Sequence, residues 1–152
     1  MPRFETSRRV RHAAADMFNL VADVEKYPEF LPLCEALAVR GRKDEADGRT
    51  VLVADMTVGY KVFRETFTSR VTLLPAEKRI QVQYLDGPFE HLDNRWTFTD
   101  NPDGTSSVGF YIDYAFRSRT LAMVMGAVFE RAVNKYTEAF ETRADKIYAK
   151  KQ

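Results

Sequence analysis

The hydrophobic period of this sequence changes along the chain, and that change limits the folds that the chain can adopt. Between Cys34 and Phe116 apolar and polar residues alternate, as in strands, and after Ser118 the apolar residues recur at helical spacing. Turn-forming residues interrupt the alternating block at 47–48, 59–60, 75–78, 86–88 and 101–104. Because these connections are too short for crossover helices, consecutive strands should pair antiparallel. With a further strand at 4–11, we expect a sheet of about seven long strands that twists and curls.

The chain after Ser118 predicts one long C-terminal helix. Ser118 is a suitable N-cap, and an apolar stripe runs from Leu121 to Ile147, which corresponds to about 28 residues and about 42 Å. A stripe of this length must be covered, and the concave face of the sheet is the surface large enough. Two short helices are expected after the first strand, at 13–22 and between Pro28 and Pro32. The predicted architecture is an α+β fold in which a curved antiparallel sheet grips one long helix.

Length and composition predict one folded unit. The 152 residues contain no repeat and no linker, so we expect a single domain over residues 1–152. The 23 basic and 22 acidic side chains nearly cancel, which argues against nucleic-acid binding by overall charge. The chain has one cysteine, Cys34, and two histidines far apart in the sequence, His12 and His91. We therefore expect neither a disulfide framework nor a metal site. The polar N-terminus and the short apolar run at 121–129 predict no signal peptide, no membrane span and a cytoplasmic location.

Aromatic residues are unusually numerous, with 11 Phe, 7 Tyr and 1 Trp. Strand alternation places Phe63, Glu65 and Phe67 on the face that meets the helix. The other strand residues expected on this face are Val82, Tyr84, Asn94, Trp96, Phe110 and Ile112, and the helix residues expected to meet them are Met125, Val128, Phe129, Ala132 and Tyr136. These residues form either a filled core or the lining of a deep apolar cavity. An unpaired buried polar group costs about 1–3 kcal/mol, so Glu65 and Asn94 each need a protein, water or ligand partner.

Recognised catalytic motifs are absent from the sequence. It contains no serine-hydrolase, P-loop or dinucleotide-binding pattern, and we assign no catalytic residue. His91 alternates with Asp93 and Arg95, which places it on the sheet face opposite Trp96. The basic residues fit either solubilising charges or, if they gather at a pocket mouth, contacts for anionic headgroups or RNA phosphates. They are Arg64, Arg70, Arg79, Arg143, Lys146, Lys150 and Lys151.

The sequence resembles a known family in three segments. They are residues 20–34 (LVADVEKYPEFLPLC), residues 63–71 (FRETFTSRV), and Gly87-Pro88-Phe89 followed by Leu92 and Trp96. These segments are similar to the coenzyme Q-binding START-domain family, which includes bacterial ribosome association toxin relatives. The likeness runs from Phe4 to Tyr148. Two departures stand out, because Leu33 occupies a position where an aromatic residue is common and Ala13 replaces a usual helix-capping residue.

The resemblance implies a helix-grip, START-like fold with a hydrophobic tunnel. It implies that the tunnel binds a polyprenylated quinone (ubiquinone), and that the protein is a lipid chaperone for respiratory electron transport, without enzymatic activity or a further cofactor. We place Glu65 and Asn94 near the quinone head. The expected gate residues are Tyr27, Phe30, Leu31 and Leu33. Transient contact with a membrane surface, peripheral to the inner membrane, is expected of such a carrier.

Two other functions stay open at this point. Bacterial members of the same family imply a ribosome-associated regulator that binds a ribosomal subunit and blocks subunit association. Related helix-grip proteins include polyketide cyclases, although the sequence offers no convincing acid–base pair for such an enzyme. A shared fold cannot separate these roles.

Overall fold

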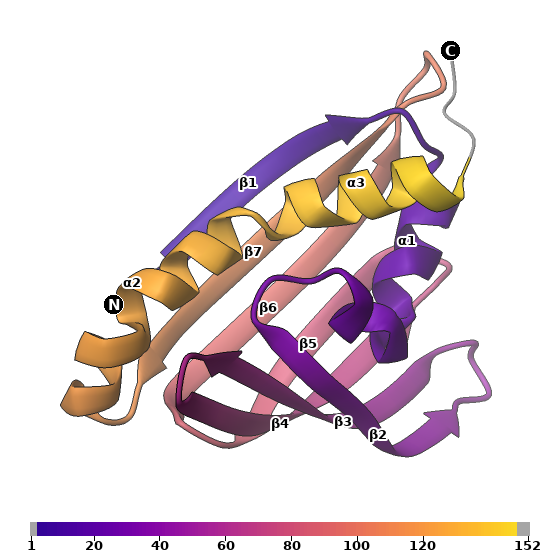
Figure 1. Cartoon of the computed structure of the whole chain (residues 1–152). Coiled ribbons are helices and arrows are strands. Elements are labelled where there is room, and N and C mark those ends of the chain that lie inside the picture. The colour runs from indigo at the N-terminus through magenta and orange to yellow at the C-terminus, as the bar shows by residue number, and fades with distance from the viewer. Residues whose placement is uncertain (1–2, 149–152) are drawn as a thin grey trace.

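The computed structural model describes residues 3–148, whose strands form a curved antiparallel sheet in the order β1-β7-β6-β5-β4-β3-β2 (Figure 1). The strands are β1 (Arg3–Val10), β2 (Cys34–Asp44), β3 (Thr50–Tyr60), β4 (Phe63–Leu74), β5 (Arg79–Asp86), β6 (Phe89–Asp100) and β7 (Ser106–Phe116). The helices are α1 (Ala14–Ala22), the 3-10 helix η1 (Val24–Glu29), α2 (Arg119–Asn134) and α3 (Tyr136–Ile147). The helices cover the concave face of the sheet (Figure 1), so the expected α+β helix-grip architecture is confirmed.

Irregular strand pairing allows the sheet to curve. The register shifts at Cys34–Ala36 in β2, at Thr68–Ser69 in β4 and at Phe89–His91 in β6. Such bulges bend a strand and increase its twist. The β5–β6 turn also requires a glycine, because Gly87 has φ +142° and a Cβ there would lie 2.6 Å from Cβ of Phe67. This turn therefore packs closely against β4.

The predicted long C-terminal helix is divided into two helices. Its N-cap is as expected, since the backbone N–H of Leu121 donates to Oγ of Ser118 at 3.2 Å. At Lys135 the backbone has φ −104° and ψ 0°, and its N–H bonds to Ala132 in a tighter turn than an α-helix makes. The expectation of one continuous helix was wrong, because α2 and α3 cross the curved face in slightly different directions (Figure 1). No helix within residues 3–148 is long and apolar enough to cross a membrane.

Of the two short helices near the N-terminus, α1 lies close to its predicted position, whereas η1 lies largely before the stretch between Pro28 and Pro32 where the second was expected. Helix α1 starts at Ala14, one residue after the predicted start, and η1 ends at Glu29, where the second helix was expected to begin. Ala13, at the N-cap of α1, has no side-chain oxygen to accept a hydrogen bond. Oδ1 of Asp100, at the end of β6, accepts instead from the N–H of Ala14 at 2.8 Å. The strand thus supplies the cap that the local sequence lacks.

Aromatic side chains form two clusters between the sheet and the helices. In the first, the ring of Phe140 on α3 lies 5.4 Å from Tyr27, 5.2 Å from Phe30 and 5.1 Å from Trp96, measured between centroids. In the second, the rings around Phe89 are those of Phe67, Tyr84, Tyr114, Phe116 and Phe129. Both clusters join helix to sheet, so much of the aromatic surplus is core material.

Candidate functional site

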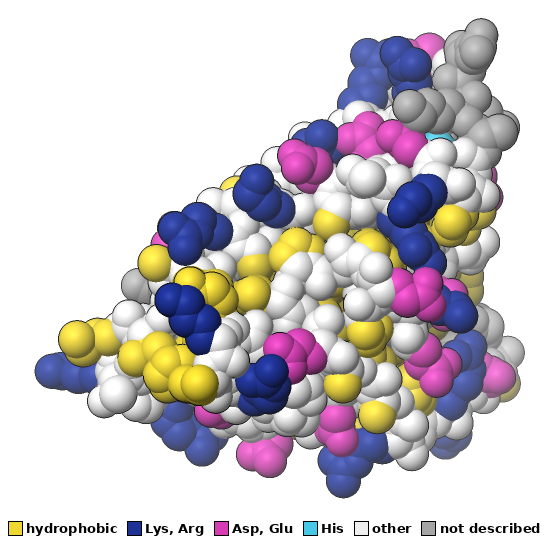
Figure 2. Space-filling model, viewed as in Figure 1, with side chains coloured by type: hydrophobic (Ala, Val, Ile, Leu, Met, Phe, Trp, Pro, Cys, Tyr) yellow, Lys and Arg dark blue, Asp and Glu magenta, His cyan; other side chains and the backbone are white. Residues whose placement is uncertain are grey.

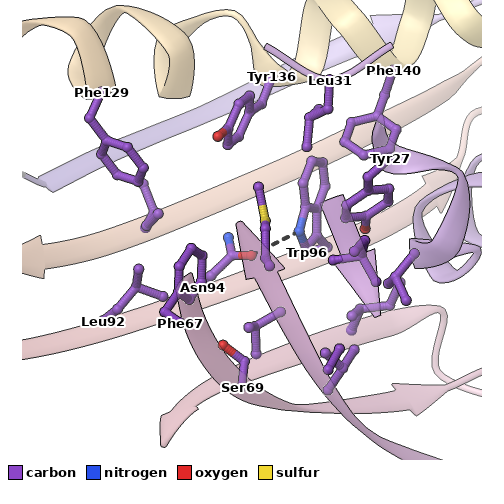
Figure 3. A pocket seen from close by; sticks show the side chains of 18 residues that line it. Tyr27, Leu31, Phe67, Ser69, Leu92, Asn94, Trp96, Phe129, Tyr136 and Phe140 are labelled. Carbon is purple, nitrogen blue, oxygen red and sulfur yellow. Dashed lines mark hydrogen bonds between the residues drawn. The ribbon is translucent and has the colours of Figure 1, made fainter. Parts of the chain in front are cut away.

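A cavity of about 90 Å³ lies between the concave face of the sheet and the helices (Figure 3). Phe129 stands at one side of it, and Tyr27 and Phe140 stand at the other (Figure 3). Its lining consists of Val24, Tyr27, Leu31, Leu37, Ala54, Met56, Phe67, Ser69, Val71, Ile80, Val82, Leu92, Asn94, Trp96, Ile112, Phe129, Tyr136 and Phe140. This lining is almost entirely apolar, and apolar side chains also show at the surface between the C-terminal helices and the segment joining η1 to β2 (Figure 2).

Half of the residues predicted to contact a ligand line this cavity. They are Tyr27, Leu31, Phe67, Val82, Asn94, Trp96, Ile112, Phe129 and Tyr136. The predicted residues that lie outside the lining are Phe30, Leu33, Phe63, Glu65, Tyr84, Phe110, Met125, Val128 and Ala132. The strand and helix periods therefore predicted faces that border the cavity, and the nine other residues lie outside its lining.

The predicted residues outside the lining have other surroundings. Phe63 and Glu65 share the face of Phe67 but lie nearer the start of β4, where Phe63 is 40% exposed. The hydroxyl of Tyr84 accepts from the N–H of Phe89 at 3.0 Å, which closes the β5–β6 hairpin. Phe110 is buried in the core, where its ring packs against Trp96. Glu65 is therefore not among the residues that line the cavity.

Several lining residues were not singled out from the sequence. Ser69 and Val71 share the face of Phe67 by strand alternation, and Phe140 belongs to the helical stripe. The remaining residues of this set are Val24, Leu37, Ala54, Met56, Ile80 and Leu92. Those on strands point to the same concave face of the sheet as the predicted residues. Strand alternation therefore indicated their face but did not distinguish cavity lining from core.

Asn94 is bonded within the protein. Its Nδ2 donates to the carbonyl oxygen of Tyr111 at 2.9 Å, and its Oδ1 accepts from the indole Nε1 of Trp96 at 3.1 Å. The dashed line in Figure 3 marks the second bond. The partner that the sequence required for Asn94 is therefore supplied by the fold.

Two hydroxyl groups in the cavity lining lack hydrogen-bond partners among residues 3–148. Oγ of Ser69 and Oη of Tyr136 belong to side chains that are 5% and 7% exposed, and both residues line the cavity. Burial raises the pKa of the Tyr136 phenol, so it stays protonated and can donate a hydrogen bond. An unpaired buried hydroxyl costs about 1–3 kcal/mol. These two groups are the available polar partners for a bound molecule.

The segment from Tyr27 to Leu33 is fastened over the cavity by several contacts. Oη of Tyr27 donates to the carbonyl oxygen of Val21 at 2.5 Å. Arg143 on α3 reaches this segment twice, because its Nη2 donates to Glu29 at 2.5 Å and its guanidinium lies 5.2 Å from the ring centroid of Phe30. Leu33 has φ 66°, a left-handed conformation that is uncommon outside glycine. The predicted gate is thus a braced but locally strained segment.

Cys34, directly after this segment, is a buried free thiol. Burial raises the pKa of the thiol to about 11. Because the thiolate is the reactive form, this environment suits a packing residue and not a nucleophile.

The predicted basic residues do not gather at one mouth of the cavity. Arg64 lies near the start of β4 and Arg79 begins β5, so these neighbouring antiparallel strands hold them at opposite ends of the sheet. Arg64 pairs with Glu35 at 2.7 Å. Lys150 and Lys151 lie outside the described residues. His91 is 3.3 Å from Asp113 and lines no part of the cavity.

Comparison with known proteins places the chain in a family. Residues 10–141 match the family described as polyketide cyclase/dehydrase and lipid transport. The chain belongs to this family. It is 32% identical to the ribosome association toxin RatA of Vibrio cholerae, over 97% of this chain and 99% of that protein. It is 26% identical to the mitochondrial coenzyme Q-binding protein COQ10 homolog B of Xenopus laevis, over 98% of this chain and 60% of that protein.

A solved structure supports the same assignment at the level of the fold. A START superfamily protein from Mycobacterium smegmatis superposes with a TM-score of 0.78, covering 96% of this chain and 99% of its own, at 18% identity. The resemblance inferred from three sequence segments is therefore confirmed as a family and fold assignment. The family contains differently named members, so function depends on the site.

Proposed function

We propose that the chain binds a single carbonyl-bearing apolar lipid, such as a polyprenylated quinone, and carries it without chemical change. The observation that carries this proposal is the pair of unpartnered hydroxyls, Ser69 Oγ and Tyr136 Oη, in an otherwise apolar cavity. A quinone ring offers two carbonyl oxygens as hydrogen-bond acceptors, and its isoprenoid tail is purely apolar. Such a ligand would satisfy the hydroxyls and cover the walls together.

The size of the cavity requires that it widen when the ligand enters. A volume of about 90 Å³ is smaller than the engineered cavity of about 150 Å³ that accepts benzene. Each buried CH₂ group of a tail contributes about 0.8 kcal/mol, which can offset the cost of moving a covering segment. The segment from Tyr27 to Leu33 is our proposed gate, because it supplies Tyr27 and Leu31 to the wall and continues into a strained backbone.

The chemistry of the lining supports binding over catalysis. Among the lining residues none is an Asp, Glu, His, Lys or Arg. Burial raises the pKa of both Tyr27 and Tyr136, which disfavours either phenol as a base. A polyketide cyclase-like reaction would have to proceed without an ionised group at this cavity, and we therefore propose a carrier.

The test is quantitative ubiquinone binding by the purified chain, with mass spectrometry of the copurified lipids. Ser69→Ala combined with Tyr136→Phe should weaken binding about tenfold or more, since two hydrogen bonds are lost with little change in shape. Ala54→Phe should abolish binding by filling the cavity, because Ala54 is 5% exposed and lines it. Tyr84→Phe is the matched control, since the Tyr84 hydroxyl bonds to Phe89 outside the cavity. Unchanged ubiquinone binding by the Ala54→Phe variant, once shown to be folded, would contradict the proposal.

Association with a ribosomal subunit is a second candidate, favoured by an observation on the outer face of the sheet. A surface groove there includes Arg3, Arg79, Arg95 and Tyr111. The guanidinium groups of Arg3 and Arg95 each lie 5.2 Å from the ring centroid of Tyr111. Cations beside an aromatic ring suit RNA phosphates and bases. The test is sedimentation of the chain with ribosomal subunits. Loss of cosedimentation in the double variant Arg3→Gln, Arg95→Gln, together with normal cosedimentation of Ala54→Phe, would support this function over lipid carriage.

A further inference from the structure

One end of the molecule carries several exposed apolar side chains. The antiparallel order of the sheet places the β3–β4 turn, the β5–β6 turn and the start of α2 at the same end (Figure 1). We call this the apolar end, and it is made of Val62, Phe63, Leu85, Met123 and Val124, which are 85%, 40%, 44%, 85% and 36% exposed. Of the exposed large hydrophobic side chains in residues 3–148, the one elsewhere is Ile147, at the end of α3.

The fold itself does not bury this surface. None of the first six residues of α2, Arg119–Val124, is buried, whereas Met125 and Phe129 farther along the helix are 2% exposed. At the β3–β4 turn, Lys61 has φ 57°, and Val62 extends into solvent. Apolar side chains clustered on a surface, without a role in the core, are typical of an interaction site.

Basic side chains border the apolar end at the β3–β4 turn and at the start of α2. Residues 60–64 and 117–129 contain Lys61, Arg64, Arg117 and Arg119 and no acidic residue. Within residues 3–148, Lys61, Arg117 and Arg119 form no ion pair, while Arg64 pairs with Glu35. The acids at the same end are Asp86 and Glu90 at the β5–β6 turn, Glu35 near the start of β2 and Glu65 near the start of β4. Figure 2 shows hydrophobic side chains at this end with Lys and Arg side chains beside them.

We propose that the apolar end docks on an anionic lipid bilayer. Val62 and Met123 would insert below the headgroups, while Lys61, Arg117 and Arg119 contact the lipid phosphates, the arrangement expected of a protein that lies on a membrane. This docking proposal rests on the proposed carrier function. It adds the surface through which such a carrier meets the bilayer. Helix α2 links the two sites, since Met123 belongs to the docking surface and Phe129 to the cavity wall.

The test is sedimentation of the full chain with vesicles of phosphatidylcholine alone or mixed with phosphatidylglycerol. We expect binding to the mixed vesicles that weakens as salt is raised. Val62→Ser and Met123→Ser should each weaken it about tenfold, and Arg117→Gln with Arg119→Gln by a similar factor. The matched controls are Ile147→Ser, an exposed apolar residue at the other end, and Arg42→Gln, near the far end of β2. Neither control should change binding.

Three results would overturn the docking proposal. The first is absence of binding to the mixed vesicles, and the second is a loss of vesicle binding in the Ile147→Ser control as large as in the Val62→Ser and Met123→Ser variants. The third is a dimer in solution that Met123→Ser dissociates, because a second copy of the chain would then cover this end. Each variant's circular dichroism identifies misfolding, and the double Arg variant tests the same surface without altering an apolar residue. The vesicles contain no quinone, and Ala54→Phe should bind them normally. Failure of docking is therefore distinguishable from failure of lipid binding in the cavity.

Discussion

The indole N–H of Trp96 donates a hydrogen bond to Oδ1 of Asn94, two residues earlier on β6, with 3.1 Å between nitrogen and oxygen. Residues two apart on a strand share a face, so both side chains reach the concave side of the sheet. Nδ2 of Asn94 donates in turn to the carbonyl oxygen of Tyr111 on β7. The amide therefore links two strands and fixes the Trp96 ring beside the cavity.

Replacing Asn94 should destabilise the fold. In Asn94→Ala the indole N–H of Trp96, a side chain that is 4% exposed, loses its acceptor. We expect the free energy of unfolding in urea to fall by about 2 kcal/mol. The control is Asn134→Ala at the exposed end of α2, which should change it by less than about 0.5 kcal/mol. Equal effects of the two substitutions would show that the Asn94 bonds contribute no net stability.

Asp100 should stabilise α1 although it lies on another element. Asp100→Ala removes the acceptor for the Ala14 N–H and should cost about 1 kcal/mol in urea unfolding. Adding Ala13→Ser should restore much of that loss, because a serine hydroxyl at the N-cap can accept the same class of hydrogen bond. Asp86→Ala serves as the exposed control. Failure of Ala13→Ser to recover any stability would contradict the capping role.

Cys34 should react slowly with thiol reagents in the folded protein. Its pKa of about 11 compares with an ordinary value of 9.0, so at pH of about 8 the folded thiol holds about a hundredfold less thiolate than the unfolded one. We expect labelling by a disulfide reagent to be slower by at least about that factor, and to become rapid in urea. Fast labelling of the folded chain would mean that the segment before β2 opens readily.

The same shift predicts a loss of stability in alkali. The folded thiol stays neutral after the unfolded thiol begins to ionise, so its contribution is complete below pH of about 9 and is lost as the pH rises toward about 11. Urea midpoints measured across this range should fall more steeply for the natural chain than for Cys34→Ala. Parallel curves for the two proteins would exclude a contribution from Cys34.

The sequence predicts the sheet well because turn residues and strand alternation are local features of the sequence. Turn residues such as Asp47-Gly48 end the strands, and alternation places Asn94 and Trp96 on one face. The break at Lys135 has no such signal, since neither proline nor glycine stands there. Asp100 capping α1 is equally invisible, because it joins residues 86 positions apart.

The limits of the cavity depend on curvature, which alternation does not describe. Glu65, Phe67 and Ser69 all have the inward phase, yet the lining includes Phe67 and Ser69 and leaves out Glu65 near the start of β4. The sequence therefore made Glu65 a candidate and gave no reason to select Ser69. What marks Ser69 is a missing partner, and that can be seen only when its neighbours are known.

The contacts of Arg143 should govern how fast a bound lipid leaves. Arg143 holds Glu29 and Phe30 against α3, and its side chain is 20% exposed. Arg143→Ala should therefore release the segment over the cavity and speed quinone transfer to acceptor vesicles several-fold. The fold itself should lose little stability, because a single ion pair of this exposure contributes about 1 kcal/mol or less. The matched control is Arg8→Ala, which removes a similar pair, at 2.6 Å to Glu141, between β1 and α3. Transfer rates that rise equally in both variants would point to general loosening of α3, and an unchanged rate in Arg143→Ala would place the gate elsewhere.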